Sequence, residues 1–143
     1  EVISEIVVCF KNGCGHCASI SESYNFNPAE VELDLVYFTT LINNLLSNAV
    51  KYSDRDPEIK INGYTDGDNA VIMISDNGIG ISRTDQKHIF DKFYRAASGN
   101  IHKYKGLGLG LYYVKKIAEA HGGDVSVSSK TGKGSIFTVS IPY

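Results

Sequence analysis

The chain has 143 residues, a formal net charge of −2 at pH 7, and apolar and charged fractions of 43% and 21%. This length is typical of one domain with its own core, and the composition is that of an ordinary globular fold. The near-neutral charge gives no reason to expect nucleic acid or an anionic membrane as partner, and no apolar run reaches the roughly 18–20 residues of a membrane span. Because the chain opens with Glu1 in mid-pattern, we expect one domain, residues 1–143, excised from a longer protein.

The first third of the chain predicts a helix, two short strands and a longer helix. Apolar residues recur at helical spacing over residues 2–12, and short strands are expected at residues 18–24 and 30–33. Asp34 suits the N-cap of a helix that runs from Leu35 to about residue 53. The buried stripe of this helix is predicted to comprise Leu35, Phe38, Ile42, Leu45, Leu46 and Ala49.

The middle of the chain predicts two strands and then a long irregular segment. The strands are expected at Glu58–Tyr64 and Ala70–Ser75, joined by a turn at residues 65–68. From residue 82 to residue 105 the pattern weakens into polar sequence with one aromatic island, residues 89–95. A segment this long without clear secondary structure is more often functional than accidental in a compact domain.

The last third predicts a helix followed by a hairpin. The helix is expected from about Gly108 to Ala120, and Gly122 and Gly123 are suited to end it. The hairpin strands are expected at Asp124–Ser129 and Ser135–Ile141. Together the elements predict a mixed sheet with helices on one face, an α/β two-layer sandwich.

The three cysteines, Cys9, Cys14 and Cys17, are an odd number and do not predict a disulfide framework. Residues 14–17, Cys-Gly-His-Cys, match the active tetrapeptide of disulfide isomerases, which hold the attacking thiolate at the start of a helix. The residues that follow are more typical of a strand, so a loop that contains cysteines is favoured over a redox protein. A zinc site with His16 is favoured still less, because the ligands are too crowded.

The long central helix carries polar residues beside its apolar stripe. Asn44, Asn48, Lys51 and Tyr52 lie at i, i+4, i+7 and i+8, within about 100° of one another on the helix surface. Neutral amide oxygens suit Mg²⁺, which takes few protein ligands besides phosphate oxygens, and a lysine supplies a point charge for phosphate. The alternative is a solvated polar edge of the helix.

Two glycine clusters follow this helix. Residues 76–80, Asp-Asn-Gly-Ile-Gly, end a strand with a carboxylate that can accept an exocyclic amine, while the glycines let the backbone approach a flat ligand. A common hairpin turn also begins with Asp-Asn-Gly. Gly106, Gly108 and Gly110 precede a helix, where free N–H groups favour anions, with close helix packing as the rival explanation.

Four segments, residues 44–52, 76–80, 90–93 and 106–110, stand together in this order, and nearly the whole chain resembles the catalytic, ATP-binding domain of sensor histidine kinases. That family belongs to a superfamily shared with gyrase, heat-shock chaperone and mismatch-repair ATPases. The resemblance implies a Bergerat-type sandwich, a mixed sheet covered on one face by helices, with ATP between the sheet and a lid at about residues 82–105.

The resemblance also implies roles for individual residues. Asp76 would receive the adenine amino group, with Ser135 supporting it through water. Asn48, helped by Asn44, would hold Mg²⁺, while Lys51 would approach phosphate. The further ATP-binding residues that the resemblance implies are Tyr52, Gly78, Gly80, Ile81, Phe93, Gly106, Leu107, Gly108, Leu109 and Gly110. Phe90 and Phe93 would anchor the lid, and Lys92 and Arg95 are the candidates for a contact with the γ-phosphate. Leu107 departs from the Thr or Ser usual at its position, which removes a hydroxyl contact and leaves the backbone contacts.

One position separates a kinase from an ATPase. In the ATPase relatives the residue four before the metal asparagine is a glutamate that activates water, whereas here it is Asn44, which accepts no proton at neutral pH. A site without such a base suits phosphoryl transfer to a better nucleophile, which depends mainly on position and charge. The alternatives are a catalytically silent nucleotide-binding module and a related ATPase.

The phosphorylated histidine is expected outside this chain. None of His16, His88, His102 and His121 has the sequence setting of the phosphoacceptor. The resemblance therefore implies two partners, a dimerisation and phosphoacceptor domain of the parent protein and the receiver domain of a response regulator. It implies a cytoplasmic location for this domain, monomeric as a fragment of a homodimeric parent, and leaves open whether the parent has a membrane anchor.

Overall fold

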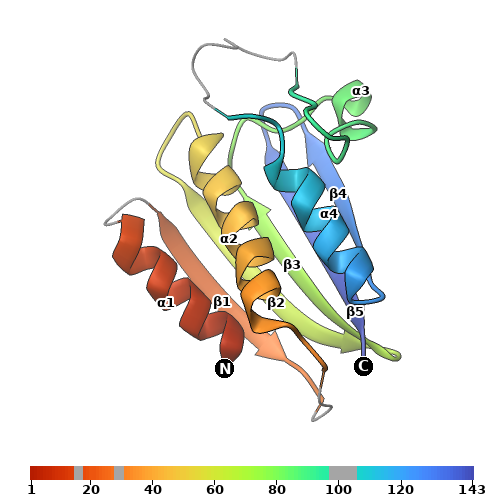
Figure 1. Cartoon of the computed structure of the whole chain (residues 1–143). Coiled ribbons are helices and arrows are strands. Elements are labelled where there is room, and N and C mark those ends of the chain that lie inside the picture. The colour runs from red at the N-terminus through yellow and green to blue at the C-terminus, as the bar shows by residue number, and fades with distance from the viewer. Residues whose placement is uncertain (15–17, 28–30, 97–105) are drawn as a thin grey trace.

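The computed structural model describes residues 1–14, 18–27, 31–96 and 106–143. Within them, a five-stranded sheet carries α1, α2 and α4 on one face (Figure 1). The helices are α1 (Val2–Cys14), α2 (Leu35–Lys51), α3 (Arg83–Gln86) and α4 (Gly110–Ala120), and the strands are β1 (Ser19–Asn25), β2 (Glu58–Asp66), β3 (Asn69–Asp76), β4 (Asp124–Lys130) and β5 (Gly134–Pro142). The predicted two-layer α/β sandwich is confirmed.

The strand order is β1-β2-β3-β5-β4, and only the β1–β2 pair is parallel. A parallel pair needs a long crossover, which here contains α2, so α2 is laid across the sheet. The antiparallel β3–β5 register sets Asp76, the last residue of β3, opposite Ser135. The chain thus brings together two residues that are 59 positions apart, at the end of the sheet away from both termini (Figure 1).

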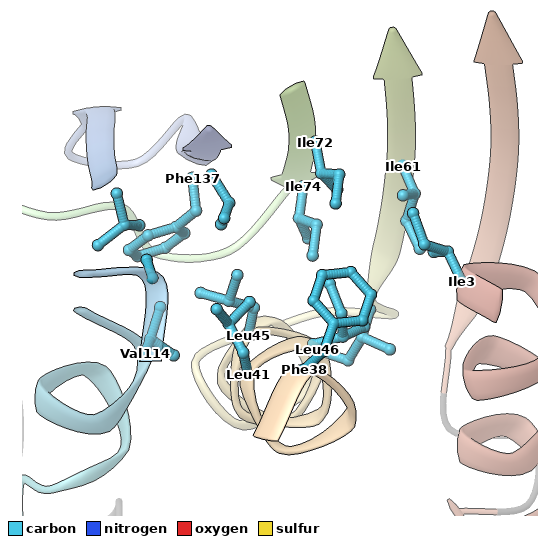
Figure 2. Close-up of a cluster of buried hydrophobic side chains, with 14 of the residues drawn as sticks. Ile3, Phe38, Leu41, Leu45, Leu46, Ile61, Ile72, Ile74, Val114 and Phe137 are labelled. Carbon is cyan, nitrogen blue, oxygen red and sulfur yellow. The ribbon is translucent and has the colours of Figure 1, made fainter. Parts of the chain in front are cut away.

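The core lies between α2 and the sheet, and Figure 2 shows Phe38, Leu41, Leu45 and Leu46 pointing from α2 toward the strands. The prediction that Leu35 is buried is wrong, because its side chain is 56% exposed. Val36 and Tyr37 are also exposed, so the first turn of α2 extends beyond the core. Leu41, absent from the predicted stripe, is fully buried instead.

The ends of the helices and strands mostly follow local sequence signals, but the structure differs from the predicted elements at three places. The carboxylate of Asp34 accepts hydrogen bonds from the N–H groups of Val36 and Tyr37, which confirms the predicted N-cap. Residues 31–33 form no strand and instead run along the core to this cap. The helix α4 begins two residues later than predicted, because Gly108 has φ +71°, a left-handed conformation that cannot continue a helix. The short helix α3 was not predicted.

Only the first residue of the cysteine tetrapeptide, Cys14, lies in the described part of the chain. α1 ends at Cys14, and residues 15–17 are outside the described part of the chain. Cys14 is disulfide-bonded, which was not predicted from the sequence, and its place at the C-terminal end of a helix differs from that of a redox dithiol, whose attacking thiolate lies at a helix start. Cys9, on α1, is an exposed free thiol.

No described helix has the length and apolar character needed to cross a bilayer.

Candidate functional site

A cavity of about 440 Å³ opens at the end of the sheet where α2 and β3 finish. Many of the predicted site residues line it: Asn48, Lys51, Tyr52, Asp76, Gly80, Ile81, Arg95, Gly106, Leu107, Gly108, Leu109, Gly110 and Ser135. Sequence reasoning missed six lining residues: Ile79, Ile89, Tyr94, Ala96, Leu111 and Phe137. Most of these are apolar, and their sequence pattern is that of core residues. The cavity is thus an extension of the core that glycines and polar groups leave open at one end.

Asp76 is positioned by backbone groups on two segments. Its Oδ1 accepts hydrogen bonds from the N–H of Gly78 at 2.8 Å and from the N–H of Ser135 at 3.3 Å. Burial raises the pKa of the Asp76 carboxyl, and these two hydrogen bonds act in the lowering direction. Among the described residues nothing donates to Oδ2. This oxygen is therefore an acceptor available to a ligand in the cavity.

The glycine-containing turn after Asp76 is fixed to its neighbours on both sides. The N–H of Ile79 donates to the carbonyl of Tyr52, at the end of α2, at 3.0 Å. Gly80 has φ +71°, and a Cβ there would lie 2.2 Å from the carbonyl oxygen of Lys130. Only glycine fits this approach. Gly78 does not line the cavity, and its contribution is the hydrogen bond to Asp76.

The polar edge of α2 divides into two parts. Asn48 and Lys51 line the cavity, and the Lys51 ammonium lies so close to Gly106 that a Cβ there would be 2.6 Å from Nζ. Asn44 is not a lining residue. Its Nδ2 donates to the carbonyl of Thr40 at 2.9 Å, and its Oδ1 faces Gly110, 3.1 Å from where a Cβ would be.

The wall opposite α2 is built from residues 89–96. Phe90 packs edge-on against Phe137 with ring centroids 6.4 Å apart, so this part of the segment is anchored in the core, as predicted. The Tyr94 hydroxyl donates to the buried carboxylate of Asp85 at 2.6 Å, and this hydrogen bond raises the Tyr94 pKa. Tyr94, rather than Phe93, therefore supplies the second fixed point.

Phe93 and Lys92 are placed differently from the prediction. The expectation that Phe93 anchors the segment is wrong, because its side chain is 62% exposed and does not line the cavity. Lys92 holds its ammonium over the Phe93 ring, 5.2 Å from the centroid, and is not a lining residue either. Arg95 does line the cavity. Residues 97–105 of the predicted lid are outside the described part of the chain.

Residues 106–110 line the cavity, and their backbone N–H groups have no partner within the part of the chain that the structure describes. Among the described residues, none of these five N–H groups donates a hydrogen bond. The loop is held through its acceptor side instead, since the carbonyl of Gly108 accepts from the N–H of Phe93 at 3.0 Å. Together with the Lys51 ammonium, these donors form a surface suited to an anion.

The side chains at the cavity also indicate how a metal ion could be bound there. Within the described ranges no three His, Cys, Asp or Glu side chains gather into a metal centre. The Asn48 amide therefore fits a hard cation only if a bound ligand supplies most of the oxygens, which is how Mg²⁺ binds with phosphates. Asp76 is the one carboxylate among the described lining residues, and no described imidazole lines the cavity.

Residues 34–143 match the family described as histidine kinase-, DNA gyrase B-, and HSP90-like ATPase, and the chain belongs to this family. It is similar to sensor protein RprX of Bacteroides fragilis, with 43% identity over 118 residues that cover 81% of this chain and 22% of RprX. It is 37% identical to sensor histidine kinase WalK of Bacillus subtilis over 79% of this chain and 19% of WalK. The chain thus spans about a fifth of the length of these curated relatives.

The fold agrees with these relationships. The solved structure of a mycobacterial sensor histidine kinase, MprB, superposes with a TM-score of 0.81 at 26% identity, covering 99% of this chain and 93% of that one. The predicted resemblance is confirmed: the chain is a catalytic ATPase domain of the type found in sensor histidine kinases.

Proposed function

We propose that this domain binds Mg·ATP and transfers the γ-phosphoryl group to a histidine on a separate dimerisation and phosphoacceptor domain of its parent protein. The receiver domain of a response regulator would then accept the phosphoryl group. The observation that carries the proposal is the distribution of charge in the cavity. Among the described residues, the only carboxylate at the cavity, Asp76, lies at the end of the sheet, while the Lys51 ammonium and the N–H groups that have no described partner lie at the glycine loop.

This distribution is complementary to ATP. The Asp76 carboxylate accepts a hydrogen bond from the adenine amino group through Oδ2, and the backbone N–H of Ser135 holds that carboxylate in place. Lys51 and the N–H groups of residues 106–110 bind the phosphates. Tyr52 contacts the ribose or the base, and the Arg95 guanidinium approaches the γ-phosphate.

The metal would be held by the amide oxygen of Asn48, which lines the cavity. Asn44 assists from the neighbouring turn through its Oδ1 against Gly110. When bound, Mg²⁺ neutralises the charge that develops on the phosphate oxygens during transfer. The structure supports this assignment through the donor chemistry, since a neutral amide beside a phosphate-binding loop is a sufficient protein contribution for this cation.

Transfer to a histidine is favoured over hydrolysis because none of the side chains that line the cavity within the described residues can act as a base for water. The Asp76 carboxylate is occupied by its hydrogen bond to adenine. The other described side chains that line the cavity do not accept protons at neutral pH. An acceptor imidazole needs no such base, because its ring nitrogen attacks phosphorus directly while the bond to the ADP oxygen breaks. We propose a cytoplasmic site for this reaction, with a homodimeric parent and a monomeric isolated domain.

The decisive experiment combines the isolated chain with the dimerisation and phosphoacceptor domain of its parent in trans. We expect very slow steady-state ATP hydrolysis by the chain alone and phosphohistidine formation on the added domain. Asn48→Ala is expected to reduce transfer by at least about 100-fold, because it removes the metal contact. Asn43→Ala, on the same helix but facing the groove between α1 and α2, serves as the matched control.

Each other outcome points to a different function. Rapid hydrolysis by the isolated chain would support a related ATPase. Tight Mg·ATP binding without phosphohistidine formation would support a silent nucleotide-binding module.

A further inference from the structure

Ser129, near the end of β4, connects three segments that surround the Asp76 end of the cavity. Its Oγ accepts a hydrogen bond from the N–H of Ile81 at 2.8 Å and donates to the carbonyl of Gly134 at 2.8 Å. The same Oγ lies 2.9 Å from the Oγ of Ser135. Ser129 does not line the cavity, so any effect on a ligand must pass through its neighbours.

The number of hydrogens in this cluster fixes the direction of its bonds. A serine hydroxyl has one hydrogen, and the Gly134 carbonyl, which cannot donate, takes the hydrogen of Ser129. The bond between the two hydroxyls must then use the hydrogen of Ser135. The Ser135 hydroxyl therefore turns its hydrogen toward Ser129 and retains only lone pairs for other partners.

This direction determines the chemistry of the cavity wall. Ser135 is 6% exposed and lines the cavity, and its N–H holds Asp76 Oδ1. A carboxylate and a hydroxyl oxygen that can only accept thus stand side by side. Such a wall favours a base edge that donates, such as a 6-amino purine, and disfavours the oxygen of a 6-keto purine.

We propose that Ser129 is a positioning residue that gives this site its preference for 6-amino over 6-keto purine nucleotides. The inference rests on the proposed function, in which Asp76 receives the base. Without the Ser129 hydroxyl, the Ser135 hydrogen is released and can donate to a keto oxygen. The backbone at position 129 keeps its place in such a variant, because Gln86 Nε2 bonds the carbonyl of Ser129 at 3.0 Å and that of Ile81 at 2.8 Å.

The test compares the Kd values of ATP and ITP, with Mg²⁺, for the parent and four variants of this chain. ITP carries a 6-keto group without the additional 2-amino group of GTP. Ser129→Ala is expected to lower the ITP/ATP ratio of Kd values by about 5- to 10-fold, which corresponds to the loss of one neutral hydrogen-bond preference. Ser129→Thr keeps the hydroxyl and should retain most of the parental ratio. Ser128→Ala, an exposed neighbour on the same strand, should retain all of it.

The fourth variant, Ser135→Ala, removes the acceptor itself and is expected to lower the same ratio, so it tests the idea even if Ser129→Ala does not fold. The proposal is overturned if Ser129→Ala weakens ATP and ITP binding equally, if Ser135→Ala keeps the parental ratio, or if the parent binds both nucleotides alike. A separate arm tests Asp76→Asn. If that variant kept the parental ratio, the assignment of Asp76 to the base would be wrong, whatever Ser129 does.

Discussion

The two ends of the cavity are built in different ways. At the sheet end, Asp76, Ser129 and Ser135 are joined to one another and to Ile81 and Gly134 by hydrogen bonds within the protein. At the glycine-loop end, the five N–H groups of residues 106–110 donate no hydrogen bond to any described residue. The sheet end is therefore held in place by hydrogen bonds within the protein, with Asp76 Oδ2 open to a ligand, whereas the N–H groups of the glycine loop have no described partner until a ligand binds.

The difference indicates how affinity and selectivity are divided. A pre-formed set of acceptors selects among ligands by geometry, because a wrong partner leaves buried polar groups unpaired. The glycine loop offers N–H donors, and Lys51 adds a cation on a flexible side chain. Both bind negative charge, so their contribution to affinity depends on ionic strength. We expect substitutions at the two ends to have distinguishable signatures.

The largest effect is expected at the sheet end. Asp76→Asn replaces the acceptor Oδ2 with an amide group and should weaken ATP binding by about 10- to 150-fold, the value of one charge-assisted hydrogen bond. Isothermal titration with Mg·ATP measures it. Asp54→Asn, an exposed carboxylate between α2 and β2, is the control for the change in net charge. ATP binding by Asp76→Asn at parental affinity would contradict the assigned role.

A smaller and salt-dependent effect is expected at the glycine-loop end. Lys51→Met should weaken ATP binding by about 10-fold at low ionic strength and by less as salt is added, because the lost interaction is between charges. Adenosine, which lacks phosphates, should bind both proteins equally. Lys60→Met on the exposed side of β2 controls for overall charge. An equal loss for ATP and adenosine would show that Lys51 contributes packing rather than charge.

Amide hydrogen exchange should separate the two ends directly. Residues 82–96 and 106–110 are expected to exchange more slowly after Mg·ATP is added, since the ligand pairs the open N–H groups and fixes the segment beside them. The amides of Ile79, Ile81 and Ser135 are already bonded within the protein and should change little. Identical protection of residues 82–96 with and without nucleotide would reject a gating lid.

The smallest effect concerns stability without ligand. Burial raises the Asp76 pKa in the folded state, so the folded protein binds this proton more tightly than the unfolded chain does. Above the raised pKa the buried carboxylate is charged and lowers stability, and the deficit disappears as the pH falls below the unfolded value. Asp76→Asn should therefore be slightly more stable than the parent at about pH 7, with the difference narrowing at about pH 4 in urea unfolding. A widening difference would mean that the Gly78 and Ser135 hydrogen bonds outweigh burial.

Local signals in the sequence were sufficient to predict most of the helices and strands and one side of the candidate site. The Asp34 cap, the glycines after β3 and the polar edge of α2 each depend on residues within about two turns or one loop of one another, so their spacing carries the information. This spacing alone predicts Asn48, Lys51 and Asp76 as site residues, and all three line the cavity. It also placed Leu35 in the core, because a helical period continues to the end of a helix even where the sheet beneath it does not.

Contacts between distant segments were decided only by the fold. The family resemblance implied that Ser135 supports Asp76, but no periodicity marks Ser135 or Ser129. The β3–β5 register and the β4–β5 hairpin bring the two serines to Asp76. Phe93 and Tyr94 are adjacent aromatic residues, and only the buried Asp85 determines which of them is held in the wall. Spacing along the chain was enough to identify many of the groups in the site, because the geometry of a helix or a turn repeats regularly along the backbone. Which of those groups meet was determined by sheet register and burial, because these depend on the whole core at once.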